Sequence, residues 1–355
     1  MKHSNNVVIK CIDDPKVWDD YVQLDPRSDF CHLFNWSRVI KEVYHHKPIY
    51  LAALENRQDK QTVHGIFPIF QFKALMRKPR LVSIPFFDNA GILGRNHAID
   101  SKLLQEGVTL LKNGLCTALE IRQDVPSVFS DSAIFENLYS KVSTLKVDLR
   151  LKLGLTSGKM MQTFKSKLRS QIKKGLKNGL KAQVGKEELI EPFYEVFSRN
   201  MRDLGSPVHS LKFFKAIFTH FKKHVFICIV NYRARPVAAG FMFRFKNEIK
   251  NPWSSSIKEF RHLNSNMFLY WEMIRFSCDM GQAIFDMGRS SRGASTFRFK
   301  KQWGPEERQL YWYRWFFNAE RINEKTENLN FRYWKRLPLK VANFFGPLVR
   351  RNISL

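Results

Sequence analysis

The same order of expected elements occurs twice along the chain, and this repetition limits the possible folds more than any other feature. Residues 48–55 and 63–70 are two apolar runs separated by a polar turn, and they predict a hairpin. Residues 225–230 and 237–243 predict a second hairpin. Each hairpin is followed by an extended stretch, a helical segment and a closing strand: 80–85, 102–112 and 118–122, then 252–256, 267–279 and 283–287. The sequence therefore predicts an α+β fold of two tandem units, each with a mixed, mainly antiparallel sheet flanked by helices.

Composition supports a globular protein with a basic surface. The 355 residues are 44% hydrophobic and include 31 Phe, which is enough to fill the cores of two domains. Lys and Arg number 59 against 32 Asp and Glu, and the net charge is +27. This excess favours an anionic partner, which could be a nucleic acid, a phosphorylated donor or an acidic membrane surface.

Neither a disulfide framework nor a metal site is expected. Five cysteines lie far apart and form no CxxC pair: Cys11, Cys31, Cys116, Cys228 and Cys278.

Residues 1–6 are polar, without the apolar region of a secretory signal, and there is no apolar run long enough to cross a bilayer. The expected location is the cytoplasm.

A strongly basic segment connects the two predicted units. Residues 159–186 contain nine basic and no acidic residues. Apolar residues recur every three or four positions, at Met161, Phe164, Leu168, Ile172, Leu176 and Leu180. The pattern predicts a basic amphipathic helix that ends or kinks near Gly175 and Gly179. Its polar face is either an ordinary solvated surface or a binding surface for a phosphate-rich partner.

The stretch with the most potential chemistry is a loop rich in Gly, Ser and Arg that follows the last predicted strand. Gly288 and Gly293 permit turns that point backbone amides at an anion. The cationic side chains of this stretch are Arg289, Arg292, Lys300 and Lys301. Such a loop suits a phosphate or carboxylate group, although an ordinary basic surface turn has the same composition.

Asp286 and Asp88 occupy equivalent places at the ends of strands in the two predicted units. Either carboxylate could accept a proton from the nucleophile in acyl transfer. The alternative is a structural role, in which an Asp binds backbone amides or pairs with an Arg. His45, His46 and His209 have no metal-binding spacing and are expected to be non-catalytic.

Several common catalytic signatures are absent from the sequence. It has no GxxxxGK[ST] or GxGxxG nucleotide loop, no GxSxG elbow and no HExxH pair. The chemistry that remains depends on positioning and electrostatics.

Five motifs resemble those of one enzyme family. They are Phe-Asn-Trp at 34–36, residues 83–91, residues 201–207, residues 266–271, and 285–290 together with Phe-Lys-Lys-Gln-Trp-Gly at 299–304. Over most of its length the chain resembles the FemAB-like branch of the GNAT-fold acyltransferases, to which the BioF2-like enzymes are related. Within that branch it is close to the group associated with exosortase (PEP-CTERM) and exopolysaccharide systems.

The resemblance implies two tandem GNAT-like domains at 1–155 and 156–315, followed by a basic aromatic tail at 316–355. It also implies transfer of an acyl or aminoacyl group to an amine or hydroxyl of a cell-envelope, peptidoglycan or exopolysaccharide precursor. Aminoacyl-tRNA is the donor of Fem proteins and acyl-CoA that of BioF2-like enzymes. Neither half contains a [QR]xxGx[GA] pyrophosphate loop or an inserted coiled-coil pair, so the donor stays open. No tightly bound cofactor is expected.

The residue types within these motifs, the loop that follows residue 290 and the basic segment 159–186 suggest a division of roles. Asp286 and Lys300 are the expected catalytic residues. The expected donor-binding or anion-binding residues are Gly288, Arg289, Ser290, Arg292, Lys301 and Arg169. The expected acceptor-binding residues are Asp88, Asn266, Tyr270 and Trp303, although a buried Tyr270 would be equally consistent with core packing.

The tail combines basic and aromatic residues. It could lie on an anionic membrane at the inner leaflet, or it could fold back onto the protein.

A different class of function also remains open, since a non-catalytic protein could hold RNA or an anionic polysaccharide with the same basic surface.

Overall fold

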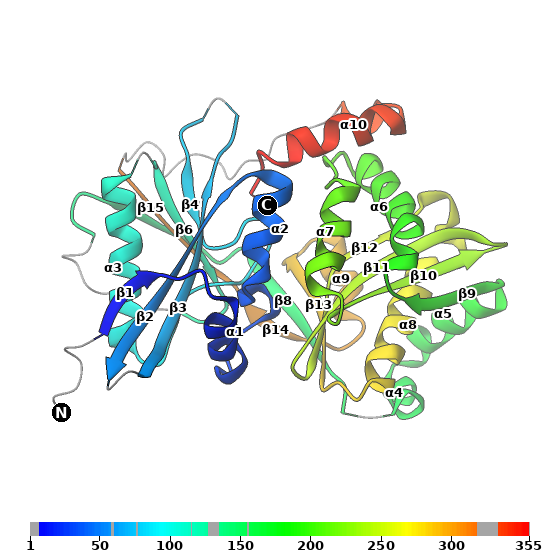
Figure 1. Ribbon diagram of the computed structural model, residues 1–355. Coiled ribbons are helices and arrows are strands. Elements are labelled where there is room, and N and C mark those ends of the chain that lie inside the picture. Colours follow the sequence, from blue (N-terminus) through cyan, green and yellow to red (C-terminus); the bar gives the residue numbers. More distant parts are fainter. Residues whose placement is uncertain are drawn as a thin grey trace. The chain divides into compact units, whose positions relative to one another are not determined.

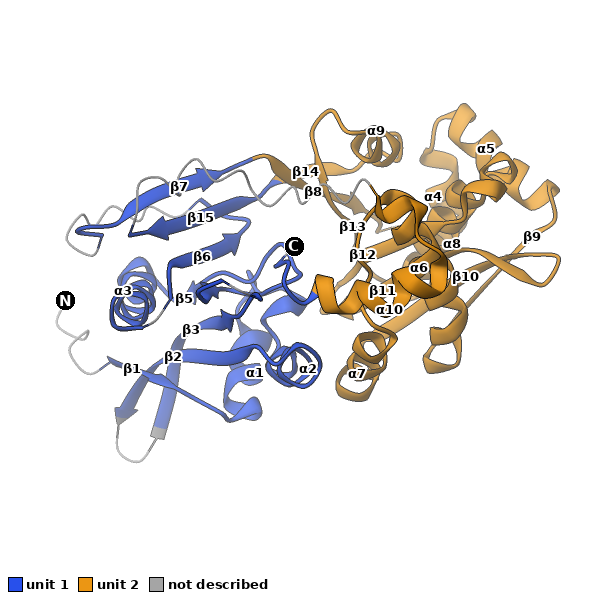
Figure 2. Cartoon of the chain, turned by 90° about the horizontal axis from the view of Figure 1, so that it is seen from above, with its two compact units in different colours: residues 1–144, 309–328, 351–355 blue, residues 145–308, 329–350 orange. Residues whose placement is uncertain are grey.

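The computed structural model describes residues 7–57, 60–75, 77–114, 116–126, 135–154, 156–317 and 333–354. The chain forms two compact units, shown in Figure 2. Unit 1 comprises residues 1–144, 309–328 and 351–355, and unit 2 comprises residues 145–308 and 329–350.

Unit 1 contains a sheet with the strand order β1-β2-β3-β4-β6-β15-β7, and β5 pairs with β3. Its elements are β1 (Val7–Cys11), α1 (Pro15–Leu24), α2 (Asn35–Tyr44), β2 (Lys47–Arg57), β3 (Lys60–Phe72), β4 (Arg80–Val82), β5 (Leu93–Gly94), α3 (His97–Asn113), β6 (Ala118–Gln123), β7 (Tyr139–Ser143) and β15 (Tyr311–Phe316). The β4–β6 pair is parallel and the other pairs are antiparallel.

Unit 2 contains a second sheet with the order β14-β8-β13-β12-β11-β10-β9 (Figure 1). Its elements are β8 (Lys146–Lys152), α4 (Ser157–Thr163), α5 (Ser166–Lys177), β9 (Leu180–Gly185), α6 (Ile190–Leu204), α7 (Leu211–Phe221), β10 (Val225–Tyr232), β11 (Arg235–Phe245), β12 (Glu248–Ser256), α8 (Ser265–Asp279), β13 (Ile284–Ser291), α9 (Ser295–Lys301), β14 (Glu306–Gln309) and α10 (Leu339–Arg350). β12 and β13 are parallel, whereas the β9–β10, β10–β11, β11–β12 and β8–β13 pairs are antiparallel. The predicted α+β class with two mixed, mainly antiparallel sheets is confirmed.

Side chains point alternately to the two faces of each sheet, and this explains why each sheet carries helices on both faces. In unit 1, Leu51 and Phe67 pack in the core beneath α3, whereas the neighbouring Tyr50 contacts Trp18 of α1. In unit 2, Met242 lies in the core shared with α8, whereas Phe241 contacts Phe193 of α6 and Phe214 of α7. Successive strand residues point to opposite faces, so both faces are apolar and both are covered.

Each unit is built from more than one stretch of the chain. The domains expected from the sequence were instead the consecutive segments 1–155, 156–315 and 316–355. β15 follows the elements of unit 2 in sequence but lies between β6 and β7 in the sheet of unit 1. Its alternating Tyr313 and Trp315 are buried in the core of unit 1, and this burial fixes the strand there.

The basic segment 159–186 forms α4, α5 and β9 rather than one helix. Helix α5 ends at Lys177, close to the predicted position, and Asn178 is its C-cap; the following Gly179 has φ +80°. Gly175 lies inside the helix and allows close packing, because a Cβ there would be 2.9 Å from Phe268 Cβ of α8. Leu176 is 63% exposed and lies off the predicted apolar face.

Two further findings bear on the expected environment. None of the helices in the described parts of the chain has the length and hydropathy needed to cross a bilayer. All five cysteines carry free thiols, and every one except Cys11 is buried.

Candidate active site

The central feature of unit 2 is a short parallel strand pair, beyond which the two strands continue without pairing to each other. β12 and β13 pair only through Glu248–Ile284, Ile249–Phe285 and Lys250–Asp286. Beyond these pairs, residues 251–256 and 287–291 are not paired with each other in the described chain. We call these two strand ends the β12–β13 fork. Both ends lie on the same edge of the sheet because the strands are parallel, and the carboxyl edge where neighbouring strands part is a common ligand site.

At the fork, side chains form hydrogen bonds with backbone amide and carbonyl groups of β13. Asp286 is 1% exposed, and its Oδ1 accepts a hydrogen bond from the Gly288 amide at 2.7 Å. The Lys300 ammonium on α9 donates to the carbonyls of Gly288 (3.0 Å) and Arg289 (2.9 Å). These bonds replace strand-ladder bonds, so Asp286 and Lys300 keep this part of β13 ordered without pairing to β12.

Gly288 is needed here for its backbone geometry. Its φ is +71°, and a Cβ at this position would lie 3.0 Å from the Asn251 carbonyl oxygen on β12. The register of β13 against β8 shifts at the same place, between Asp286 and Arg289. A glycine bulge therefore changes which face of the sheet the following side chains occupy.

A row of buried and part-buried charges lies on one face of this sheet region. The Lys250 ammonium is 3.2 Å from Asp286 Oδ2 and 3.8 Å from Asp148 Oδ2. Arg150 of β8 forms an ion pair with Glu248 of β12. Because buried carboxylates and ammonium groups are stable only when paired, this row fixes the relative positions of β8, β12 and β13.

Polar side chains gather on the opposite face, which α8 covers. Ser290 pairs across from Val147 and thus shares the face of Leu149, a residue of the α8 core. Its Oγ is buried and has no hydrogen-bond partner among the described residues. Trp303 Nε1 is also buried without a partner in that part of the chain. Unsatisfied buried donors and acceptors are costly, so these two atoms suit a polar ligand.

Tyr270 completes this polar group. Its hydroxyl lies 2.9 Å from Ser254 Oγ. Burial raises the pKa of Tyr270 to about 12, although the hydrogen bond with Ser254 acts in the opposite direction. The ring stacks on Trp303 with centroids 6.1 Å apart and contacts Phe299 edge to face at 5.0 Å. Tyr270 therefore stays a neutral hydrogen-bond donor at physiological pH.

The cations of the predicted anion loop lie further along the chain. Arg292 Nε donates to Glu307 Oε2 at 3.0 Å, and Lys301 Nζ lies 3.1 Å from Glu307 Oε1. Hydrogen bonds from Lys301 and Arg292 lower the pKa of Glu307. Arg289 is on the face of Asp148, opposite that of Ser290. Of the four predicted cations, Lys300 thus binds backbone carbonyls, and Arg292 and Lys301 share one carboxylate.

The structure does not bring every predicted residue to the fork. Arg169 on α5 donates to the carbonyls of Gln162 and Phe164. Asn266 is half-buried in the first turn of α8. Asp88 belongs to unit 1, where its carbonyl accepts a hydrogen bond from Trp312 Nε1.

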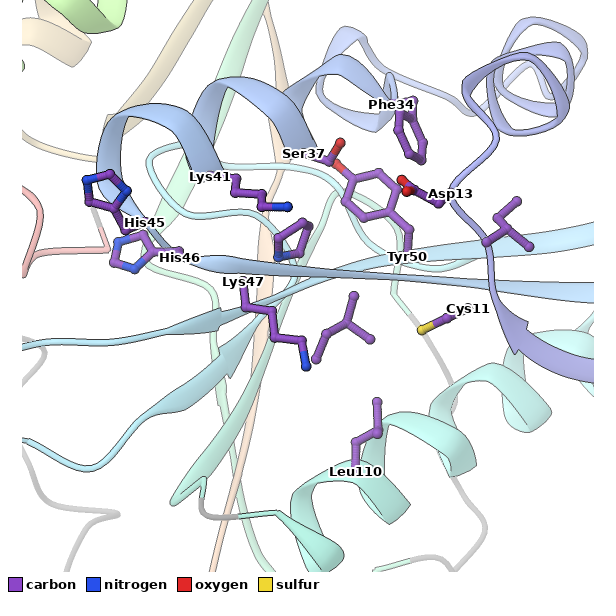
Figure 3. A pocket seen from close by; sticks show the side chains of 13 residues that line it. Cys11, Asp13, Phe34, Ser37, Lys41, His45, His46, Lys47, Tyr50 and Leu110 are labelled. Carbon is purple, nitrogen blue, oxygen red and sulfur yellow. The ribbon is translucent and has the colours of Figure 1, made fainter.

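Unit 1 holds a cavity of about 730 Å³ between α2, α3 and the first half of β2 (Figure 3). Lys41, His45 and Lys47 line it, and Tyr50 lies at its inner wall. His46 is also in the lining, but its Nε2 bonds to the Arg351 carbonyl and its Nδ1 accepts from the Lys73 amide. Burial lowers the pKa of His46 to about 4, so this ring is neutral and structural.

Sequence patterns did not single out three residues of the fork region. Asp148 and Lys250 belong to alternating strands without a motif. Asn251 precedes Pro252, and both oppose Met242 at a bulge. A proline within a strand indicates such a bulge, so Pro252 is the signal that could have marked the site.

Comparison with known proteins is consistent with this geometry. Residues 162–301 match the family model of the acetyltransferase (GNAT) domain. This part of the chain resembles a GNAT acetyltransferase domain. The fork, α8 and α9 all lie within or beside the matched GNAT domain. No curated protein sequence matches the chain.

Solved structures extend the likeness to both units. FemX has 12% identity and a TM-score of 0.67, with 86% of this chain and 96% of FemX covered. A tandem GNAT protein from the clavulanic acid biosynthesis pathway has 10% identity and a TM-score of 0.54, covering 86% and 98%. L-PGS from Bacillus licheniformis has 14% identity and a TM-score of 0.53, covering 91% and 97%. The predicted resemblance to FemAB-like GNAT acyltransferases and the tandem GNAT fold are confirmed.

Proposed function

We propose that the chain transfers an acyl or aminoacyl group from a phosphate-bearing carrier to an amine or hydroxyl of a cell-envelope or exopolysaccharide precursor. The observation that carries this proposal is the β12–β13 fork of a GNAT domain, with the Tyr270 hydroxyl, Ser290 Oγ and Trp303 Nε1 buried on one face. The donor carbonyl would bind at the fork, where these groups can hydrogen-bond to it.

The reaction needs little covalent chemistry from the protein. The acceptor nitrogen or oxygen attacks the donor carbonyl carbon, and the new bond forms as the carbon–sulfur or carbon–oxygen bond to the carrier breaks. In balance, the nucleophile loses one proton and the leaving sulfur or oxygen gains one. Tyr270 is protonated at neutral pH and can give its proton to that leaving group, and the proton released by the nucleophile then restores the Tyr270 hydroxyl. Holding the reactants together supplies much of the remaining acceleration.

The contacts of Asp286 and Lys300 favour a positioning role for both residues. Asp286 uses one carboxylate oxygen for the Gly288 amide and the other for Lys250. Lys300 holds the carbonyls that follow. In this proposal, Asp286 and Lys300 set the shape of the fork. The positive charge of Lys300 also stabilises an anionic transition state.

The carrier phosphates would bind the basic residues near the fork. Arg289, Arg292 and Lys301 supply cations on the loop, and α5 adds an exposed basic surface. Helix α5 is held beside the start of α8, since Asn264 Nδ2 donates to the Gln171 carbonyl and Asn178 Nδ2 to the Leu263 carbonyl. Both acyl-CoA and aminoacyl-tRNA are polyanions that fit this surface.

Calorimetric titration with acetyl-CoA, aminoacyl-tRNA and uncharged tRNA, each at two salt concentrations, tests the proposal. We expect one acylated donor to bind more tightly than its unacylated form, and Arg289→Ala to weaken that binding. Lys223→Ala, which removes an exposed cation after α7, is the matched control. Binding of tRNA that is equal with and without the aminoacyl group, with a steep salt dependence, would instead favour a non-catalytic RNA-binding protein.

A further inference from the structure

Helix α10 packs on unit 2 through its small residues and exposes its large apolar ones. Ala342 is 1% exposed and Gly346 is buried. A Cβ on Gly346 would lie 2.8 Å from Val208 Cγ1, so a larger residue does not fit there. By contrast, Phe344 is 69% exposed and Phe345 is 50% exposed. This is the reverse of the usual arrangement, in which a helix buries its large apolar side chains.

The exposed residues form one stripe. Val341, Phe344, Phe345 and Leu348 are spaced three and four residues apart, so they lie on neighbouring turns of the same helix face. The rings of Phe344 and Phe345 contact each other edge to face, with centroids 5.0 Å apart. We call these four residues the α10 stripe.

Polar contacts fix the helix to unit 2, so the stripe has a defined orientation. Asn343 Nδ2 donates to Ser198 Oγ of α6 at 3.3 Å, and Arg350 Nε donates to His209 Nε2 at 3.1 Å. Just before α10, Arg202 of α6 donates to the Leu337 carbonyl. Figure 1 shows α10 running beside α6. The described part of the tail therefore folds back onto the protein while one helix face stays in solvent.

The chain segment that carries the stripe has charges of a single sign. Residues 333–354 contain no acidic residue. The basic residues of this segment are Lys335, Arg336, Lys340, Arg350 and Arg351. Lys335, Arg336 and Lys340 are exposed. Apolar side chains next to cations match the interface of an anionic bilayer, where rings enter the acyl boundary and cations bind lipid phosphates.

We propose that the α10 stripe docks this protein on the surface of an anionic phospholipid bilayer. The four-residue apolar stripe favours lipid over RNA, because RNA binding needs cations and stacking rings but gains nothing from Val341 or Leu348. This docking surface is independent of the fork, and it would bring the enzyme to acceptors that are carried by lipids.

Vesicle flotation of the full-length protein tests this inference. We expect the protein to float with vesicles of phosphatidylcholine mixed with phosphatidylglycerol, to float poorly with phosphatidylcholine alone, and to dissociate as salt rises. Phe344→Ser combined with Phe345→Ser should weaken binding roughly tenfold or more. Leu176→Ser with Leu204→Ser is the matched control, since both leucines are exposed on other helices of unit 2.

A charge variant separates lipid binding from general stickiness. Lys335→Gln, Arg336→Gln and Lys340→Gln together should abolish the preference for phosphatidylglycerol, whereas Lys222→Gln, Lys223→Gln and Lys258→Gln should leave most of it. Circular dichroism confirms that each variant is folded. The proposal is overturned if the phenylalanine variant floats like the wild type, if the wild type binds neither vesicle, or if light scattering shows that the stripe joins two copies of the chain instead.

Discussion

The ammonium group of Lys300 lies 3.0 Å from the carbonyl oxygen of Gly288 and donates a hydrogen bond to it. This contact joins α9 to the bulge of β13, at the point where β12 and β13 stop pairing. The two residues are twelve apart in sequence, and the loop that contains Arg289 and Arg292 runs between them. The geometry of the loop and that of the fork therefore depend on the same bond.

Lys300→Met should reduce both activity and stability. The substitution leaves the carbonyls of Gly288 and Arg289 without their donor, and an unsatisfied buried polar group costs about 1–3 kcal/mol. Urea unfolding and a transfer assay measure the two effects. Lys301→Met is the control, because Lys301 pairs with Glu307 in a part-exposed salt bridge worth about 1 kcal/mol or less. Equal stability of the two variants would contradict the structural role of Lys300.

Tyr270→Phe should lower kcat without changing the shape of the pH profile. The variant keeps the ring that stacks on Trp303 and loses only the hydroxyl that contacts Ser254. Since the pKa of Tyr270 is raised to about 12, its hydroxyl is protonated throughout the usual assay range. The loss should be uniform from acid to alkaline pH. Wild-type kcat in the variant would remove Tyr270 from the mechanism.

Gly175→Ala should destabilise unit 2 although alanine favours helices. Alanine gains about 1 kcal/mol in helix propensity over glycine, but its Cβ would lie 2.9 Å from Phe268 Cβ, and overpacking costs about 1–3 kcal/mol. Gly158→Ala in α4 is the matched control, because a Cβ there meets nothing within 4 Å. Thermal unfolding should show a lower Tm for Gly175→Ala and an unchanged or higher Tm for Gly158→Ala.

Unit 1 should lose stability in acid through Glu120. Burial raises the pKa of Glu120, but the charges of Arg122 and Arg314 outweigh burial and bring it to about 2, below its ordinary value of 4.5. A depressed carboxyl pKa stabilises the fold above the unfolded-state value and loses that contribution as pH falls from about 4.5 towards 2. Urea unfolding across this pH range measures the effect.

Glu120→Gln tests the assignment. Removing the carboxylate should flatten the acid dependence and destabilise unit 1 at neutral pH by about 3–5 kcal/mol, because Arg122 is fully buried and bonded to Glu120. An unchanged acid transition in the variant would assign that transition to another group.

Local patterns were enough to predict the repeated core of the fold. The two hairpins correspond to β2–β3 and β10–β11, and the predicted segments 102–112 and 267–279 lie within α3 and α8. These elements alternate or repeat their apolar residues at short range. The location of β15 in unit 1 depends instead on which distant strand buries Tyr313 and Trp315, and no local pattern contains that information.

The candidate site was predictable only in part, for the same reason. Asp286, Gly288 and Lys300 stood out because they belong to one motif, and the structure joins them through hydrogen bonds. Asp148 and Lys250 come from strands far apart in sequence, and strand register alone brings them together.

A crystal structure with the donor bound tests the central claim most directly. We expect the acyl carbonyl to lie at the β12–β13 fork, with the donor's leaving atom within hydrogen-bond distance of the Tyr270 hydroxyl. Donor density in the unit 1 cavity lined by Lys41 and Lys47, with an empty fork, would contradict it.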